Sequence, residues 1–149
     1  MRTFPKITDP LALSGPTPND LNGWYEIDCT ITSPFRISRS SLVHLVQGKV
    51  HSLNDQPALI IPRGNNIFYL QYYFNNSVSR LTGPALLDIE GPLVWSENNL
   101  LFADNRIIRK YYVIDNFRID PTQYFERYDV QLAIKKLNLK EQILSIRTD

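Results

Sequence analysis

Alternation of apolar and polar side chains predicts strands through the middle of the chain. Residues 25–31 read Tyr-Glu-Ile-Asp-Cys-Thr-Ile, in which every second residue is apolar, and this period of two is typical of a half-buried strand. The run Leu42–Val46 and the aromatic run Ile67–Phe74 predict further strands. Asparagine pairs at 75–76 and 98–99 indicate hairpin turns, because asparagine tolerates positive φ. The chain is therefore predicted to be mainly β.

A strand-and-turn unit repeats within this region. Residues 48–61 are echoed by residues 76–89, and an imperfect third copy runs from Leu100 to Ile119. Pro57 and Pro84, 27 residues apart, each precede alanine and a short apolar run. A period of this length indicates stacked units, because one unit alone cannot bury its apolar face. The sequence predicts an antiparallel β-meander or hairpin array with units at about residues 47–75, 76–99 and 100–119.

The two ends of the chain have a different character. Residues 1–22 carry four prolines and are expected to form an extended arm, whereas residues 23–149 form a single β-rich domain. Asp120, Pro121 and Gln123 are spaced as an N-cap, a first helical residue and a capping glutamine. This spacing predicts a C-terminal helical segment over residues 120–146, in which Asn138 starts a second short helix.

Three short motifs in the repeat carry a resemblance. They are Ser79-Arg-Leu-Thr-Gly-Pro-Ala85, the more divergent segment Lys49–Ala58, and Trp95-Ser-Glu-Asn98. The repeat resembles the Gly-Pro-Ala and Trp-x-x-Asn repeat of uncharacterised proteins of large DNA viruses and phages, over roughly residues 47–127. The resemblance implies a viral or phage origin and a hairpin array that ends in a capped helix, and it implies no activity.

Composition and charge indicate the cellular compartment in which the protein occurs. The 16 Lys and Arg residues against 15 Asp and Glu leave a formal charge of +1, which gives no net field toward nucleic acid or an anionic membrane. Cys29 is the sole cysteine, so no disulfide forms within the chain and a reducing compartment is favoured. The first residues lack the apolar region of a signal peptide, and no apolar stretch has the length of a membrane helix. We therefore expect a cytoplasmic protein.

Residues suited to catalysis or metal binding are sparse. His44, His51 and Cys29 are too few for a structural zinc site. No nucleophile elbow or glycine-rich phosphate loop occurs. Asp88 and Glu90 share one face of a strand, but solvated acids are ordinary beside the adjacent turn. The sequence favours a non-enzymatic protein with no catalytic residue, no metal and no cofactor.

The strongest candidate for function is a binding surface rich in tyrosine and arginine. Alternation places Phe68, Leu70, Tyr72 and Phe74 toward the core and Tyr69 and Tyr73 on the other face. Tyrosine and arginine are enriched where proteins bind one another, although plain packing explains the same pattern. The predicted binding residues are Tyr69, Tyr73, Arg80, Arg109 and Tyr111.

This surface leads to one main hypothesis and two alternatives. The main hypothesis is a virus- or phage-encoded module that binds a host or viral protein through the exposed tyrosine and arginine face. A nucleotide-binding, sponge-like protein is the first alternative, because aromatic and cationic side chains also bind bases and phosphates. The second is a structural virion component. Exposed sheet edges also allow homo-oligomers.

Overall fold

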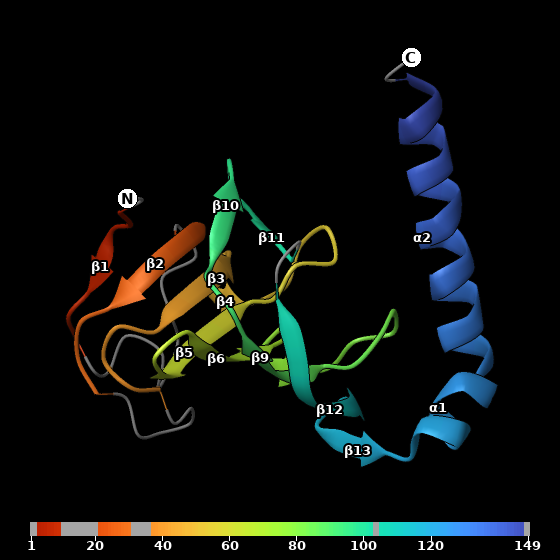
Figure 1. Ribbon diagram of the computed structural model, residues 1–149, viewed down its shortest axis with the longest axis horizontal. Coiled ribbons are helices and arrows are strands. Elements are labelled where there is room, and N and C mark those ends of the chain that lie inside the picture. Colours follow the sequence, from red (N-terminus) through yellow and green to blue (C-terminus); the bar gives the residue numbers. More distant parts are fainter. Residues whose placement is uncertain (1–2, 10–20, 31–36, 103–104, 148–149) are drawn as a thin grey trace.

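The computed structural model describes residues 3–9, 21–30, 37–102 and 105–147. Strands are the predominant secondary structure and two helices follow them (Figure 1). The elements are β1 (Lys6–Ile7), β2 (Gly23–Ile27), β3 (Leu42–Val46), β4 (Lys49–Val50), β5 (Leu59–Gly64), β6 (Ile67–Gln71), β7 (Tyr73–Phe74), β8 (Ser77–Val78), β9 (Leu86–Glu90), β10 (Val94–Ser96), β11 (Asn99–Leu101), β12 (Arg106–Ile114), β13 (Phe117–Ile119), α1 (Pro121–Glu126) and α2 (Tyr128–Arg147). The predicted β-rich fold with a C-terminal helix is confirmed.

One large sheet organises the strands. Its order is β1-β2-β3-β5-β6-β9-β12-β13, and β4 pairs with β3. From β2 to β13 every neighbouring pair is antiparallel, which is the predicted meander. The first edge strand differs, because β1 pairs with β2 in parallel. The described part of the proline-rich arm thus lies against the sheet, and residues 10–20 are outside the described part of the chain.

Three equivalent hairpin turns connect the repeats. Gln47-Gly48, Asn75-Asn76 and Asp115-Asn116 each have positive φ at both central residues, as type I′ turns require. The first and second turns are 28 residues apart and the second and third are 40 apart. The longer interval contains the additional β10–β11 hairpin. The repeat therefore has a common turn and strand geometry with an insertion between its second and third turns.

Each turn binds the backbone of the segment that precedes it by one repeat. The N–H of the second turn residue donates to a carbonyl oxygen there, at the same distance in all three turns. These bonds join Gly48 to Leu21, Asn76 to Val50 and Asn116 to Val78, each at 2.9 Å. The Asn76 and Asn116 side chains also accept from the N–H of Val50 (2.7 Å) and Val78 (2.8 Å). We call these contacts, together with the side-chain bonds to the first residue of each turn, the turn ladder.

A side chain completes each rung of the turn ladder. It accepts a hydrogen bond from the N–H of the first turn residue, and its chemistry differs from rung to rung. The pairs are Asn22 Oδ1 with Gln47 (2.8 Å), His51 Nδ1 with Asn75 (3.0 Å) and Ser79 Oγ with Asp115 (3.2 Å). The role of these positions is thus to accept a bond, which asparagine, histidine and serine all fulfil. This explains why the repeat is degenerate in sequence and regular in structure.

Apolar side chains are buried on both faces of the sheet. The first core contains Ile27, Val43, Leu45, Leu59 and Tyr73. The second contains Trp24, Leu70, Tyr72, Leu87 and Ile89. The β10–β11 hairpin extends this second core, where the Trp95 and Trp24 rings pack edge to face at 5.2 Å. The first core packs on β2, β3 and β5 and does not extend over β6, β9 and β12, so its face of the sheet is uncovered at these three strands.

The helix begins as predicted but breaks at a different residue. The Asp120 carboxylate accepts from the Thr122 N–H at 2.9 Å and caps α1. The backbone becomes extended at Arg127 (φ −70°, ψ 134°), and α2 starts at Tyr128. The expected second start near Asn138 is wrong. Asp129 provides the new start instead, because its carboxylate pairs with Arg127 at 2.9 Å and accepts from the Val130 N–H.

Tyr124 fastens α1 to the loop before β9. Its side chain is fully buried, and its hydroxyl lies 2.7 Å from the Arg80 carbonyl oxygen and 2.9 Å from that of Gly83. The hydroxyl also accepts from the Gly83 N–H at 3.2 Å. Val130 and Ile134 pack with Tyr112 and Tyr124 in a third core. The first turns of α2 are therefore held against the sheet.

Beyond these turns α2 stands away from the sheet (Figure 1). Apolar side chains occur on two opposite sides of the helix, at the 3.6-residue spacing of its turns. Val130, Ile134 and Leu137 face the body of the protein. The outward residues are exposed, Tyr128 by 77% and Leu139 by 57%. The helix is consequently apolar on both sides rather than on one stripe.

Candidate functional site

A row of side chains crosses the three adjacent strands β6, β9 and β12 on the uncovered face. Antiparallel register places Tyr69 of β6 opposite Asp88 of β9, and Asp88 opposite Arg109 of β12. The Arg109 Nε lies 3.3 Å from the Asp88 carboxylate, whose side chain is mostly buried, while 66% of the Arg109 side chain is exposed. The Asp88 carboxylate thus lies between the Tyr69 ring and the Arg109 guanidinium, and its ion pair holds the exposed guanidinium in place.

The next row adds a second tyrosine, and two further arginines cover the rings. Tyr111 of β12 pairs with Leu86 of β9. The Arg118 guanidinium lies 3.7 Å from the Tyr111 ring centroid, and that of Arg63 lies 4.4 Å from the Tyr69 centroid. Both distances are within the range of cation–π contacts. We call the set Arg63, Tyr69, Asp88, Arg109, Tyr111 and Arg118 the tyrosine–arginine face.

The electrostatics of this face favour a negatively charged partner. Arg106 and Glu90 form a further cross-strand ion pair at 2.8 Å beside it. Counting this pair, four arginines and two carboxylates leave a formal charge of +2. Partial burial raises the pKa of Tyr69, so its hydroxyl stays protonated at neutral pH and can donate a hydrogen bond.

Three of the five predicted binding residues meet on this face. They are Tyr69, Arg109 and Tyr111, which come from two strands and are brought together by the sheet register. Their role in binding stays a prediction. Arg63, Asp88 and Arg118 were not among the predicted binding residues, and the acidic residues of β9 and basic residues of β12 were the available signal for Asp88.

Tyr73 is not on the exposed surface, so its prediction requires correction. It is 6% exposed and belongs to the first core. The sheet strand β6 ends at Gln71, and Tyr73 opens the separate β7–β8 hairpin, which covers that core. Its hydroxyl donates to the Gln71 side chain at 2.6 Å. Phe74 is 60% exposed rather than in the core, because it also lies in this hairpin.

Arg80 is likewise remote from the tyrosine–arginine face. Its Nε and one terminal nitrogen each bind an Asp55 oxygen at 3.0 Å, and its side chain is 14% exposed. The other terminal nitrogen donates to the Pro84 carbonyl at 2.9 Å, and the guanidinium covers the Tyr72 ring at 3.8 Å. A Cβ at Gly83 would come within 3.1 Å of this guanidinium. Arg80 therefore joins two loops rather than presenting a free cation.

One sheet edge lies open beside the tyrosine–arginine face. Among the described residues, β13 pairs with residues 112–114 of β12 and no strand pairs with the outer edge of residues 106–110. Arg106, Arg109 and Lys110 occur on this segment. Cationic side chains on an edge oppose addition of a like strand, which disfavours pairing with a second copy through β12.

Residues that suggested other chemistry have structural roles. His44 bonds the His51 carbonyl at 2.8 Å and its ring packs on Trp24. Cys29 is buried, as expected. Within the described ranges, no group of three His, Cys, Asp or Glu side chains is arranged to hold a metal ion. None of the described helices is long and apolar enough to cross a membrane.

Comparison of this chain with protein-family models, curated proteins and solved structures found no match.

Proposed function

We propose that the chain is a non-enzymatic binding module whose tyrosine–arginine face engages a partner protein through carboxylate side chains of that partner. The observation that carries this proposal is the row Tyr69, Asp88 and Arg109, which displays aromatic and cationic groups together on three adjacent strands. Tyrosine and arginine supply much of the energy of protein interfaces, because both combine apolar area with polar groups. The charge of the face is complementary to acidic side chains.

The geometry of the face also limits the entropic cost of binding. Strands β6, β9 and β12 are rigid supports, and ring contacts hold Arg63 and Arg118 in place. A guanidinium that stacks on a ring keeps its N–H groups available in its own plane, so it can bind a carboxylate at the same time. Side chains that are ordered before binding lose less freedom on association.

The same contacts favour a protein over a nucleotide. A base would stack on the ring faces of Tyr69 and Tyr111, but guanidinium groups already cover one face of each ring, and the sheet lies behind them. The partner then approaches the arginine edges rather than the rings. The resemblance of the repeat to proteins of large DNA viruses and phages supports a host or viral protein as this partner.

Affinity capture with a matched pair of variants tests the proposal. Arg109 and Arg39 are both exposed arginines, 66% and 68%, that pair with aspartates, and Arg39 lies outside the face. Tagged wild type, Arg109→Glu and Arg39→Glu are incubated with lysate of the natural host. We expect wild type and Arg39→Glu to retain one protein in near-equal amounts, and Arg109→Glu to retain at least about tenfold less, because like charges in an interface cost several kcal/mol.

Thermal melting of the three proteins excludes loss of the fold. Equal retention by Arg109→Glu, or a partner lost equally in both variants, would contradict the proposal. Recovery of a nucleotide in place of a protein would support the nucleotide alternative instead.

A further inference from the structure

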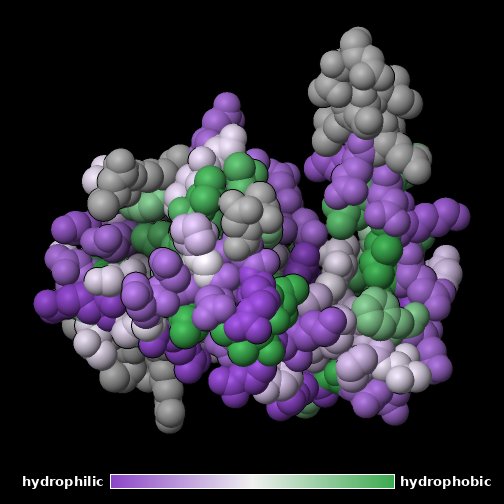
Figure 2. Space-filling model, viewed as in Figure 1, coloured by the Kyte–Doolittle hydropathy of each residue, from purple (hydrophilic) through white to green (hydrophobic). Residues whose placement is uncertain are grey.

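A second candidate site lies where α2 stands away from the sheet. Figure 2 shows the notch between the helix and the body of the protein. Two adjoining cavities occupy it, of about 1000 Å³ and about 470 Å³. They share Asp55, Tyr72, Arg80 and Leu137 as lining residues. We call this space the α2 cleft. Its larger part has the size of pockets that bind small molecules.

The floor of the cleft is rigid and polar. Arg80 and Asp55 form their paired contact there, and Thr82 bonds the same carboxylate. This clamp ties the turn at residues 53–56 to the loop at residues 79–84, and Tyr124 holds that loop from below. The floor is therefore fixed before any ligand arrives.

Tyr72 provides an unused polar group within the cleft. Its side chain is 2% exposed, and it lines both cavities. The Arg80 guanidinium contacts its ring, but no described residue forms a hydrogen bond with its hydroxyl. Burial raises the pKa of Tyr72 to about 12, so the hydroxyl is protonated and available as a donor. Since no fully buried side-chain oxygen or nitrogen of the described residues lacks a partner, this hydroxyl is reached from the cavities, where water or a ligand can form a hydrogen bond with it.

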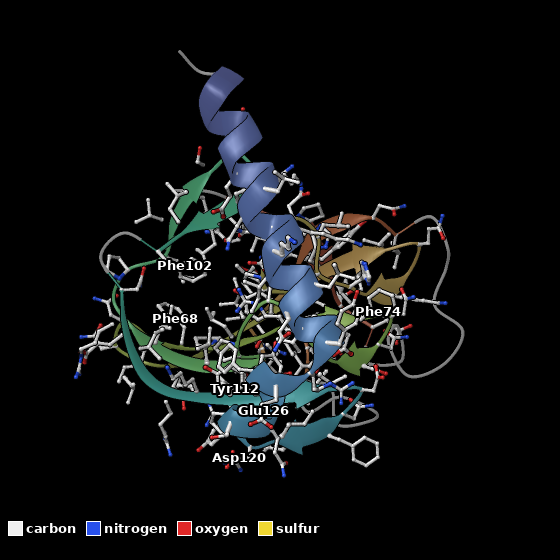
Figure 3. The ribbon with its side chains drawn as sticks, turned by 90° about the vertical axis from the view of Figure 1, so that its right-hand side faces the viewer. Phe68, Phe74, Phe102, Tyr112, Asp120 and Glu126 are labelled. Carbon is white, nitrogen blue, oxygen red and sulfur yellow. The ribbon has the colours of Figure 1, made fainter. Side chains whose placement is uncertain are left out.

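The walls of the cleft are apolar at one end. Leu87, Ile89, Phe102 and Ile107 line the smaller cavity opposite Leu137 of α2. Figure 3 looks at α2 from the front, with Phe102 to one side of the helix and Phe74, at the larger cavity, to the other. An elongated apolar molecule can contact these side chains along its length.

The charges around the cleft balance. Four basic and four acidic side chains line the larger cavity. They are Arg80, Arg127, Lys136 and Lys140, and Asp55, Asp115, Asp129 and Glu141. Two of these pairs are direct, Arg80 with Asp55 and Arg127 with Asp129. A cleft with no net charge offers a charged ligand no compensation for its desolvation.

We propose that the α2 cleft binds a neutral, elongated and mainly apolar small molecule that carries an oxygen acceptor for the Tyr72 hydroxyl. The apolar part lies between Leu137 and the side chains of β9 and β12, and the oxygen reaches the floor beside Arg80. This site is separate from the tyrosine–arginine face, so binding of the ligand does not depend on the protein partner.

Displacement of a neutral fluorescent probe, N-phenyl-1-naphthylamine, tests the site in the full chain. The competitors are 2-decanone, which is neutral with a carbonyl acceptor, decane, which has no acceptor, and decanoate, which is charged. We expect 2-decanone to compete at the lowest concentration. In Tyr72→Phe its affinity should fall about three- to tenfold, the effect of one hydrogen bond, while the affinity of decane stays unchanged.

Two leucines on α2 provide a matched control for the location. Leu137 lines the cleft, and Leu139 is exposed on the opposite side of the helix. Leu137→Gln should weaken probe binding at least fivefold, while Leu139→Gln leaves it unchanged, with melting temperatures measured for all variants. Absence of probe binding to wild type, equal effects of the two leucine variants, or an unchanged affinity of Tyr72→Phe for 2-decanone would each overturn the proposal.

Discussion

At the scale of single residues, two neighbouring histidines show how local contacts fix protonation. His44 Nδ1 donates to the His51 carbonyl oxygen, whereas His51 Nδ1 accepts from the Asn75 N–H in the turn ladder. An accepting nitrogen must be unprotonated. Burial lowers the pKa of both imidazoles, and the nearby charge of His44 lowers the pKa of His51 further. His44 lies in β3 and His51 directly follows β4, and within the described ranges neither belongs to a group arranged to hold a metal ion.

The first prediction concerns pH. The ordinary pKa of histidine is 6.5 and both folded-state pKa values are lower, so the unfolded chain binds protons more readily than the folded one. The stability that the two unprotonated histidines contribute is fully present above the unfolded-state pKa of 6.5. It is lost as the pH falls through 6.5 toward the lower folded-state pKa values. We expect the free energy of unfolding, measured in urea, to decrease between about pH 7.5 and about pH 5.5, by at most about 1.4 kcal/mol per pH unit for each histidine.

A serine at position 51 isolates the contribution of the ladder histidine. Ser79 occupies the equivalent position in the next rung, so His51→Ser retains an acceptor and removes a titrating group. This variant should have a flatter pH profile than the wild type. A profile as steep as that of the wild type would show that His51 does not cause the dependence.

At the scale of elements, the turn ladder explains why the units stack in one register. Each hairpin turn binds the strand of the preceding unit through its backbone, and the second and third turns add an asparagine side chain. These side chains give the N–H groups of Val50 and Val78 a hydrogen-bond partner, as backbone donors in folded proteins require. The turns therefore link successive units.

Two asparagines separate the ladder bond from backbone strain. Asn76 and Asn66 both have positive φ, at 69° and 55°, but only Asn76 has a ladder bond, from the Val50 N–H. Replacement by alanine costs about 1–2 kcal/mol at either position for the left-handed backbone. Asn76→Ala should lose about 1–3 kcal/mol more, because the Val50 N–H is left unsatisfied. Urea denaturation of the two variants measures the difference, and equal losses would contradict a stabilising role of the ladder.

The elements also show where the sequence is informative. The hairpin turn expected at Asn98-Asn99 lies one residue earlier, at Glu97-Asn98, and Asn99 begins β11. Period-two alternation identified the strand Leu42–Val46, and the asparagine pair at 75–76 identified the turn between β7 and β8, because both signals depend on neighbouring residues. The capped start of α1 was visible at Asp120 for the same reason. The break at Arg127 was not visible in the sequence. It depends on the Asp129 carboxylate, which binds both the Arg127 side chain and the Val130 N–H. The position of Tyr73 in the core was missed because it depends on where β6 ends.

At the scale of the whole molecule, two candidate binding sites of different kinds lie on different parts of the fold. The tyrosine–arginine face is polar, positively charged and supported by the sheet. The α2 cleft has balanced charge and lies between the sheet body and a helix that contacts it through its first turns. The sequence contained the residues of the face, and sheet register brought three of the predicted residues together. The cleft could not be predicted, because it arises from the angle at which α2 leaves α1.

Hydroxyl-radical footprinting of the chain, alone and with the captured partner, tests the central claim of a binding face most directly, because it reports the exposure of single side chains. The tyrosines provide both the test and an internal control, since Tyr69 and Tyr111 lie on the face and Tyr128 is 77% exposed on α2. The account predicts that the partner reduces oxidation of Tyr69 and Tyr111 several-fold and leaves Tyr128 unchanged. Protection of Tyr128 with no change at Tyr69 and Tyr111 would contradict it and would place the interface on the helix.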